Sequence, residues 1–412
     1  MTTKLEEFAA EIGRHVFLRE FSFSKNTFRA ACGSERELAD HVIALPAETL
    51  VFQIKERDAG AASNERAIVN WFNKKVLKDG CGQLRDSETF LRDQPHLLIG
   101  NQRGHRFDLA QKTSRIVKIL LHSASGAPVP RVVSSCRYKI SSRVGFVHVL
   151  NIEDYYHLCR CLLAPRELSE YFAFRQQLLE SGNAEPPSEA MIAAMFVAEA
   201  TSPLEDSEAR RILEAALADN VSFDLGPILS KYGDRLVYHQ GETDSLDYYR
   251  ILEEFCRLHR ADLRALKRLM MWALECAGAD EPEIPCRMKA SSSVGFVVLP
   301  VPAAAFNTRV NGLINFTTLM KYDWKLEKAI GISFAKGSEM IDIDWCLVEG
   351  QWTFDPEIEG ALQRHYPFRQ TPEARTVVRV LPGRVRDRGV AHSAESSGPA
   401  WTGRRGLTPQ SS

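Results

Sequence analysis

The sequence has no stretch that approaches the ~18 consecutive apolar residues of a membrane span, so we expect no membrane association. Its start, MTTKLEEFAAEIGRHVF, has acidic residues where a secretory signal needs a basic start and an apolar run, which favours a cytoplasmic protein. An excess of one charge is also missing, because 52 Lys and Arg residues stand against 53 Asp and Glu residues. Any nucleic-acid partner must therefore bind a local basic patch.

Paired cysteine motifs and several common catalytic motifs are missing as well. The nine cysteines are an odd number without a C-x-x-C array, which argues against a zinc site and favours reduced thiols in apolar surroundings. The patterns G-x-S-x-G, H-E-x-x-H and G-x-x-x-x-G-K-[ST] do not occur, which argues against common serine hydrolases, zinc proteases and P-loop NTPases. What is present is a chain of 412 residues with the composition of a globular protein, long enough for two or three domains.

The N-terminal part alternates helical and strand patterns. Apolar residues recur at helical spacing over residues 4–20, and a long helical pattern covers residues 65–92. Strand patterns lie near residues 21–28, 39–45, 49–55, 97–100 and 115–123, and a further one ends at residue 150, before a helix that continues through residue 171. This order predicts an α/β domain over residues 1–180, with a mixed sheet flanked by helices.

The rest of the chain is predicted as three further regions. Residues 181–280 read as a helical connector, with a strong helical pattern over 248–276. Residues 281–381 return to mixed strand and helix, which indicates a C-terminal α+β domain, and residues 382–412 have the composition of a disordered tail.

One short segment is repeated. Residues 136–150, CRYKISSRVGFVHVL, and residues 286–300, CRMKASSSVGFVVLP, agree at nine of fifteen positions. A duplicated strand-entry element and chance local similarity both explain the match.

The residues that carry the most chemical information are Asp40, Gln53 and Lys55. Asp40 opens one apolar strand, while Gln53 and Lys55 lie two apart on the next strand and therefore share a face. A hairpin between these strands would bring the three together. Metal-assisted phosphodiester hydrolysis needs such a set, in which oxygen ligands hold the cation and a lysine near the attacking water stabilises charge or assists deprotonation. A strand-capping Asp40 and a solvated Lys55 are the alternatives.

With these residues the sequence resembles the PD-(D/E)xK nuclease superfamily. The resemblance lies in the helix–strand–strand–strand–helix order, with Glu20 at the end of the first helix, Asp40 on the second strand and Gln53-Ile54-Lys55 on the third. It implies a restriction-endonuclease-like fold and Mg²⁺- or Mn²⁺-dependent cleavage of DNA. The implied roles are metal ligands for Glu20, Asp40 and Gln53, with Lys55 directed toward the water.

The sequence departs from the usual pattern of that superfamily at two points. Gln53 stands where Asp or Glu is usual, a replacement found in some active branches, particularly those that resemble modification-dependent restriction enzymes. The Pro-Asp dipeptide is also missing. One carboxylate fewer implies weaker metal binding. Glu20 is the expected source of a second acid, and a surface carboxylate at the helix end is its alternative role.

Basic residues near these strands are candidates for DNA contacts. Lys74, Lys75 and Lys78 fall within one helical turn and could form a ridge for phosphates, with a solvated helix face as the alternative. Arg103 lies on a glycine-punctuated turn, GNQRGHRFD, that could contact a nucleic-acid backbone. Asp342 and Asp344 share one strand face, which suits either metal chelation or exposure to solvent.

These observations together predict a Mg²⁺-dependent endonuclease, in restriction or defence against foreign DNA, with a homodimer as a possible assembly. A catalytically inactive nuclease-like module that binds nucleic acid or a protein partner is the main alternative. A purely structural assembly protein is the third hypothesis, and it predicts no cleft at Asp40.

Overall fold

The computed structural model describes residues 3–24, 26–29, 33–61, 64–110, 115–182, 186–234, 246–338 and 340–368. These residues belong to one compact unit, Met1–Phe368. The predicted tail at 382–412 and the end of the predicted C-terminal domain, residues 369–381, lie outside the described residues. None of the described helices is both long enough and apolar enough to cross a membrane.

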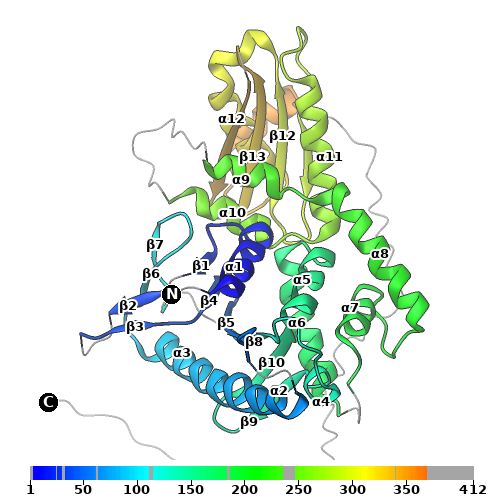
Figure 1. The fold of residues 1–412 in the computed structure, drawn as a ribbon. Coiled ribbons are helices and arrows are strands. Elements are labelled where there is room, and N and C mark those ends of the chain that lie inside the picture. The colour runs from blue at the N-terminus through cyan, green and yellow to red at the C-terminus, as the bar shows by residue number, and fades with distance from the viewer. Residues whose placement is uncertain are drawn as a thin grey trace, which may run out of the picture. The chain divides into compact units, whose positions relative to one another are not determined.

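Helices account for much of the described chain (Figure 1). They are α1 (Lys4–Phe17), α2 (Glu65–Trp71), the π-helix η1 (Phe72–Gly80), α3 (Cys81–Asp93), α4 (Arg131–Ser134), α5 (Ile152–Cys161), α6 (Pro165–Glu180), α7 (Glu189–Val197), α8 (Asp206–Phe223), α9 (Gly226–Asp234), α10 (Tyr248–Cys256), α11 (Arg260–Cys276), the 3-10 helix η2 (Ala303–Thr308), α12 (Arg309–Asp323) and α13 (Pro356–Arg364).

A six-stranded mixed sheet organises the N-terminal half, in the order β1-β4-β5-β8-β10-β9. Its strands are β1 (Ser22–Ser24), β4 (His41–Ala44), β5 (Thr49–Glu56), β8 (Ile116–Ser123), β9 (Tyr138–Ser141) and β10 (Gly145–Asn151). The neighbours β1, β4 and β5 are antiparallel, β5, β8 and β10 are parallel, and β9 is antiparallel to β10. Two short hairpins accompany the sheet, formed by β2 (Thr27–Arg29) with β3 (Glu35–Glu37) and by β6 (Leu98–Gly100) with β7 (Arg106–Asp108).

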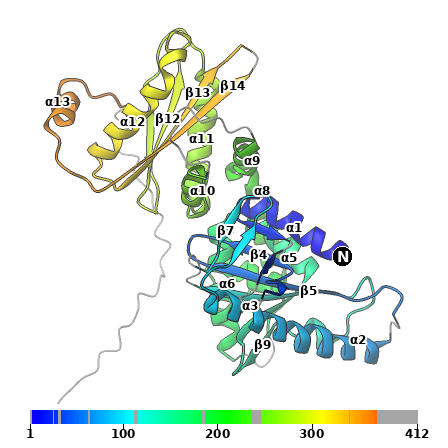
Figure 2. The ribbon, with the colours of Figure 1, turned by 90° about the vertical axis from the view of Figure 1, so that its left-hand side faces the viewer.

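Helices cover both faces of this sheet, as predicted (Figure 2). On β5, Leu50, Phe52 and Ile54 belong to the core that also contains the apolar face of α1 and residues of α5. The alternate residue Val51 belongs to a second core with residues of η1 and α3. Because side chains alternate along a strand, Gln53 and Lys55 lie on the face of η1 and α3.

The helix after β5 is continuous through both glycines at which the sequence pattern loosens. α2, η1 and α3 follow one another without a break. At Gly80 an added Cβ would come within 2.6 Å of a methyl carbon of the buried Leu120, so this position allows close packing of the helix on β8.

A second, four-stranded sheet has the order β11-β12-β13-β14 and lies between α11 and α12. Its strands are β11 (Cys286–Lys289), β12 (Gly295–Val301), β13 (Lys328–Lys336) and β14 (Ile341–Glu349). The central pair β12–β13 is parallel, and both outer pairs are antiparallel.

The repeated segment forms the same kind of unit in both sheets. β9–β10 and β11–β12 are antiparallel hairpins whose second strand pairs in parallel with its other neighbour. The pairs Ser141↔Gly145 and Lys289↔Gly295 show that three residues form the first turn and five the second. Aligned residues pair differently, because Lys139 pairs with Val147 whereas the equivalent Lys289 pairs with Gly295. The shared residues thus specify a local hairpin but not its register.

Two helices predicted as continuous are each broken in two. The helix expected from residue 154 through 171 is interrupted between α5 and α6, where Pro165 begins the second helix. The pattern over 248–276 divides between α10 and α11. In both cases the apolar period continues across the break because both pieces face one core, so periodicity alone could not locate the boundary.

Candidate functional site

The β4–β5 hairpin brings Asp40 and Gln53 to neighbouring positions. The register pairs His41 with Phe52, so Asp40, which directly precedes β4, lies opposite Gln53. The backbone N–H of Ile54 donates to Asp40 Oδ2 at 2.5 Å, which fixes the carboxylate against β5. The hairpin therefore holds Asp40 on the face that carries Gln53 and Lys55.

The Lys55 ammonium lies among three oxygen atoms. Its Nζ is 3.2 Å from Asp40 Oδ2, 3.4 Å from Gln53 Oε1 and 3.1 Å from the carbonyl oxygen of Ile54. The side chains of Lys55 and Asp40 retain 17% and 14% of their exposure, so this cluster is largely enclosed yet open to solvent. An acid, an amide and an ammonium thus meet at the end of β5.

Among the described residues, Ile54 and Lys55 both donate to Oδ2 of the Asp40 carboxylate. The other oxygen, Oδ1, can therefore bind a further partner. Gln53 is 4% exposed, and its amide oxygen accepts from Lys55. The available donors are carboxylate, amide and carbonyl oxygens, which are the ligand types that Mg²⁺ accepts.

A second carboxylate, Glu37, lies within electrostatic reach of this cluster. Burial and the carboxylate of Asp40 raise the pKa of Glu37, Glu6 adds to that effect, and the Lys55 ammonium opposes it. Glu37 lies on β3, an exposed three-residue strand that the sequence pattern did not reveal. Its position three residues before Asp40 is the one signal that could have drawn attention to it.

His122 lies beside Lys55 on the neighbouring strand β8. It pairs with Lys55 in the parallel register of β5 and β8, and its ring makes edge contacts with Trp71 and Phe72 at centroid distances of 6.5 and 5.1 Å. Burial, together with the positive charge of Arg137, lowers the pKa of His122 to about 4. The ring is therefore neutral at pH 7.

Glu20 is not part of this cluster, which corrects the expectation that it provides the second acid. α1 ends at Phe17, and Leu18, at a φ of 66°, redirects the chain into β1. The β1–β4 register pairs Ser24 with His41, so Glu20 lies beyond the opposite end of β4 from Asp40. About five strand residues, or about 16 Å along the sheet, separate the two positions.

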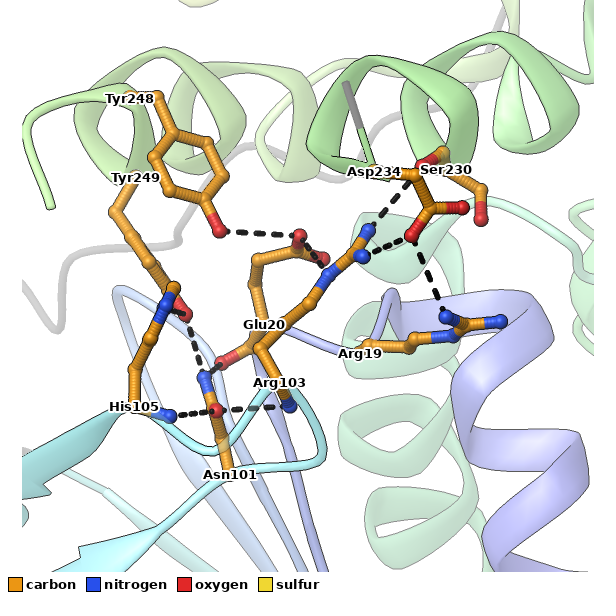
Figure 3. Close-up of polar contacts among 9 residues, drawn as sticks. All are labelled: Arg19, Glu20, Asn101, Arg103, His105, Ser230, Asp234, Tyr248 and Tyr249. Carbon is orange, nitrogen blue, oxygen red and sulfur yellow. Dashed lines mark hydrogen bonds and ion pairs between the residues drawn. The ribbon is translucent and has the colours of Figure 1, made fainter. Parts of the chain in front are cut away.

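Glu20 and Arg103 instead form a buried ion pair (Figure 3). Glu20 is 2% exposed, and its Oε1 accepts from Arg103 Nε at 2.7 Å and from the Tyr248 hydroxyl at 3.3 Å. Arg103 also pairs with Asp234 and donates to the carbonyl oxygen of Ser230. These contacts occupy the guanidinium of Arg103, so the structure removes it from the predicted nucleic-acid surface.

Asn101 and His105 of the Arg103 turn are directed inward as well, whereas Arg106 is exposed. Asn101 Nδ2 donates to the carbonyl oxygen of Glu20 and to the Tyr249 hydroxyl. His105 Nδ1 lies 2.9 Å from the same hydroxyl. The pattern of Gly, Asn, Arg and His in this turn therefore reflects a buried polar network, which links the β6–β7 hairpin to α10 (Figure 3).

Lys74, Lys75 and Lys78 are all exposed on η1. Lys75 pairs with Asp79 at 3.1 Å, which leaves the net charge of this face positive. A π-helix spaces its backbone hydrogen bonds five residues apart, and such segments occur frequently at functional sites. η1 contacts both β5 and β8, so the lysines lie on the helix that packs over the strand of Gln53 and Lys55.

The aspartates of β14 bind an arginine. Arg309 Nε donates to Asp344 Oδ2 at 2.9 Å, and Asp342 lies 3.6 Å from the same guanidinium. Ser333 also donates to Asp344. Among the described residues, no group of three or more His, Cys, Asp or Glu side chains is arranged to hold a metal ion, in either sheet.

Because the protein buries neutral histidines, we expect its folded state to lose stability in mild acid. Burial lowers the pKa of both His41 and His122 to about 4, whereas an unfolded histidine titrates near about 6.5. The unfolded chain therefore binds more protons between these values, and the free energy of unfolding falls as the pH decreases from 6.5 to 4. Each ring contributes on the order of 3 kcal/mol to that loss.

This pH effect is measured by urea unfolding at pH 7.5 and 5.0. His122→Phe removes one titrating ring and retains an aromatic contact with Trp71 and Phe72. We expect the variant to lose less stability than the wild type between the two pH values. Equal losses in both proteins would contradict the assignment of His122 as a neutral buried ring.

Comparison with protein families, with curated proteins and with solved structures gives no match to this chain.

Proposed function

We propose that this protein is a metal-dependent nuclease that cleaves DNA at the Asp40, Gln53 and Lys55 cluster. The observation that carries the proposal is the position of Lys55 Nζ, within 3.4 Å of oxygens from Asp40, Gln53 and Ile54. A cation surrounded by three oxygen atoms at the end of two strands marks a place where positive charge is stabilised. The alternation of α1, three antiparallel strands, a helix and the parallel strand β8 supports a restriction-endonuclease-like fold.

The donor set fits a hard divalent cation such as Mg²⁺ or Mn²⁺. Asp40 Oδ1, Gln53 Oε1 and the Ile54 carbonyl would hold it, and Glu37 adds negative charge nearby. When bound, the cation polarises the scissile phosphate and makes a water molecule more acidic. Lys55 then donates hydrogen bonds to the negative charge that develops on the phosphate, and the backbone N–H of Ile54 keeps Asp40 oriented.

DNA cleavage is tested directly by incubating supercoiled plasmid and linear DNA with the purified chain. We expect nicking or cutting in the presence of Mg²⁺ or Mn²⁺ and none in the presence of a chelator. Cleavage that continues at full rate in the chelator would rule out the proposed metal dependence.

A catalytically inactive DNA-binding module is the second candidate function. It is favoured by the observation that Asp40 is the one carboxylate in direct contact with Lys55 among the described residues. In that case the lysines of η1 would bind DNA that is not cut. A homodimer stays a prediction in either case.

The basic ridge predicts a salt-dependent affinity for DNA. Replacing Lys74, Lys75 and Lys78 together by alanine removes three exposed positive charges from η1. We expect the magnitude of the slope of log affinity against log salt to fall by about 3, because each phosphate contact releases about one counterion. Arg103→Ala, measured in parallel by fluorescence anisotropy, should lower protein stability and leave this slope unchanged. A smaller slope in Arg103→Ala alone would contradict the assignment of the DNA surface.

A further inference from the structure

A cavity lies at the other end of β4 from Asp40. It has a volume of 260 Å³ and is formed by the start of β1, the β4–β5 turn, β7 and α10. This volume is close to the lower end of the range for small-molecule sites, about 300 Å³. The cavity can therefore admit a ligand of one or two rings.

Aromatic rings form much of the wall of this cavity. Phe21, Phe23, Phe107 and Tyr249 all line it. Phe107 lies 4.8 Å from Tyr249 and 6.3 Å from Phe23 between ring centroids, so the rings form one connected surface. Such a surface favours a flat aromatic ligand, which gains by stacking or edge contacts.

Polar groups of the wall define the chemistry of the ligand. Two of them, Glu20 and Glu253, carry carboxylates, and Arg257 adds one guanidinium. Among the described residues, Arg103 and Tyr248 both donate to Oε1 of Glu20, which leaves Oε2 with capacity to accept from a ligand. A buried acceptor of this kind favours an N–H donor and disfavours a phosphate.

We propose that this cavity binds a nucleobase with an exocyclic amino group, presented as a free base or nucleoside. The ring stacks against Phe107 and Tyr249, and the amino group donates to Glu20. The inference does not rest on the nuclease proposal, because the cavity and the Asp40 cluster share no residue.

The test is calorimetric titration of the full chain with adenosine and with purine riboside, which has the same rings but no amino group. We expect adenosine to bind at least about tenfold more tightly, because a hydrogen bond to a charged acceptor contributes about 1.5–3 kcal/mol. Tyramine, which combines an aromatic ring with an aliphatic ammonium, tests the other ligand class. Binding of tyramine without adenosine, no binding of either, or equal binding of the two purines would each overturn the proposal.

A cavity-filling variant locates the binding. Ala44 lines the cavity and is partly exposed on β4, so Ala44→Phe should occupy the space without removing a buried contact. We expect adenosine binding to be lost while the unfolding midpoint stays close to that of the wild type. Phe107→Leu, which removes one aromatic wall, should weaken binding at least about fivefold. Unchanged adenosine affinity in both variants would overturn the assignment of the cavity.

Discussion

Replacing Lys55 by alanine is expected to reduce DNA cleavage by about 100- to 10,000-fold, and Asp40→Asn should have an effect of the same order. Lys55 is the one ammonium within 3.2 Å of Asp40 among the described residues. Its removal leaves the developing charge on the phosphate without a donor. Asp40→Asn replaces the carboxylate by a neutral amide of the same shape, so it weakens cation binding with little change in packing. Initial rates of plasmid nicking in Mg²⁺ measure both effects.

A matched control separates loss of the site from loss of a surface charge. Lys328 lies on β13 and pairs with Glu254 at 2.9 Å, so Lys328→Ala also removes a lysine from a partly buried ion pair. We expect this variant to cleave DNA at the wild-type rate. Cleavage that persists unchanged in Lys55→Ala and Asp40→Asn would show that another site, or a contaminant, is responsible.

The second large effect concerns stability and the fully buried Arg175. Its Nε donates to Glu189 Oε1 at 2.8 Å and its Nη2 to Glu189 Oε2 at 2.9 Å, while Nη1 lies 3.0 Å from His148 Nδ1. Tyr171 donates to the same carboxylate. Burial acts to raise the pKa of Glu189, but Arg175 outweighs it, so the pKa lies below its usual value and the pair is charged. Arg175→Met should therefore lower the free energy of unfolding by about 3–5 kcal/mol.

A double variant distinguishes an unpaired charge from lost packing. Arg175→Met leaves Glu189 buried without its cation, whereas Arg175→Met with Glu189→Leu replaces the pair by apolar side chains. We expect the double variant to regain much of the lost stability, as measured by urea unfolding at pH 7.5. Arg85→Met, at the exposed pair with Asp86, should change stability by less than about 0.5 kcal/mol. A double variant less stable than Arg175→Met would contradict this account of the buried pair.

Local patterns were sufficient to predict a mixed sheet flanked by helices. The periodicity of residues 49–55 and 115–123 gave β5 and β8 nearly to the residue, because each strand is a short apolar run bounded by turn residues. The mixed sheet with helices on both faces followed from the order of these elements. The exposed β3 and the edge strand β9 have few buried side chains, so apolar spacing could not reveal them.

At the candidate site, contacts within one hairpin were predictable from the sequence, and contacts between distant segments were not. Asp40, Gln53 and Lys55 are joined by one hairpin, and a four-residue connection limits how far apart they can lie. Glu20 and Arg103 are 83 residues apart, and their pairing depends on how β6–β7 and α10 pack around the start of β1. A contact of this kind has no local signal in the sequence. The prediction that Glu20 lies beside Asp40 was therefore wrong, and Glu20 pairs with Arg103.

The most direct test of the central claim is Mn²⁺ binding, measured by titration calorimetry without DNA, in the wild type and in two variants at Gln53. Gln53→Glu adds a carboxylate of the same shape, and Gln53→Leu removes the oxygen donor. If Asp40, Gln53 and the Ile54 carbonyl hold one cation, the Glu variant will bind Mn²⁺ at least about tenfold more tightly than the wild type and the Leu variant at least about tenfold more weakly. Equal affinity in all three proteins would contradict a metal site at this cluster.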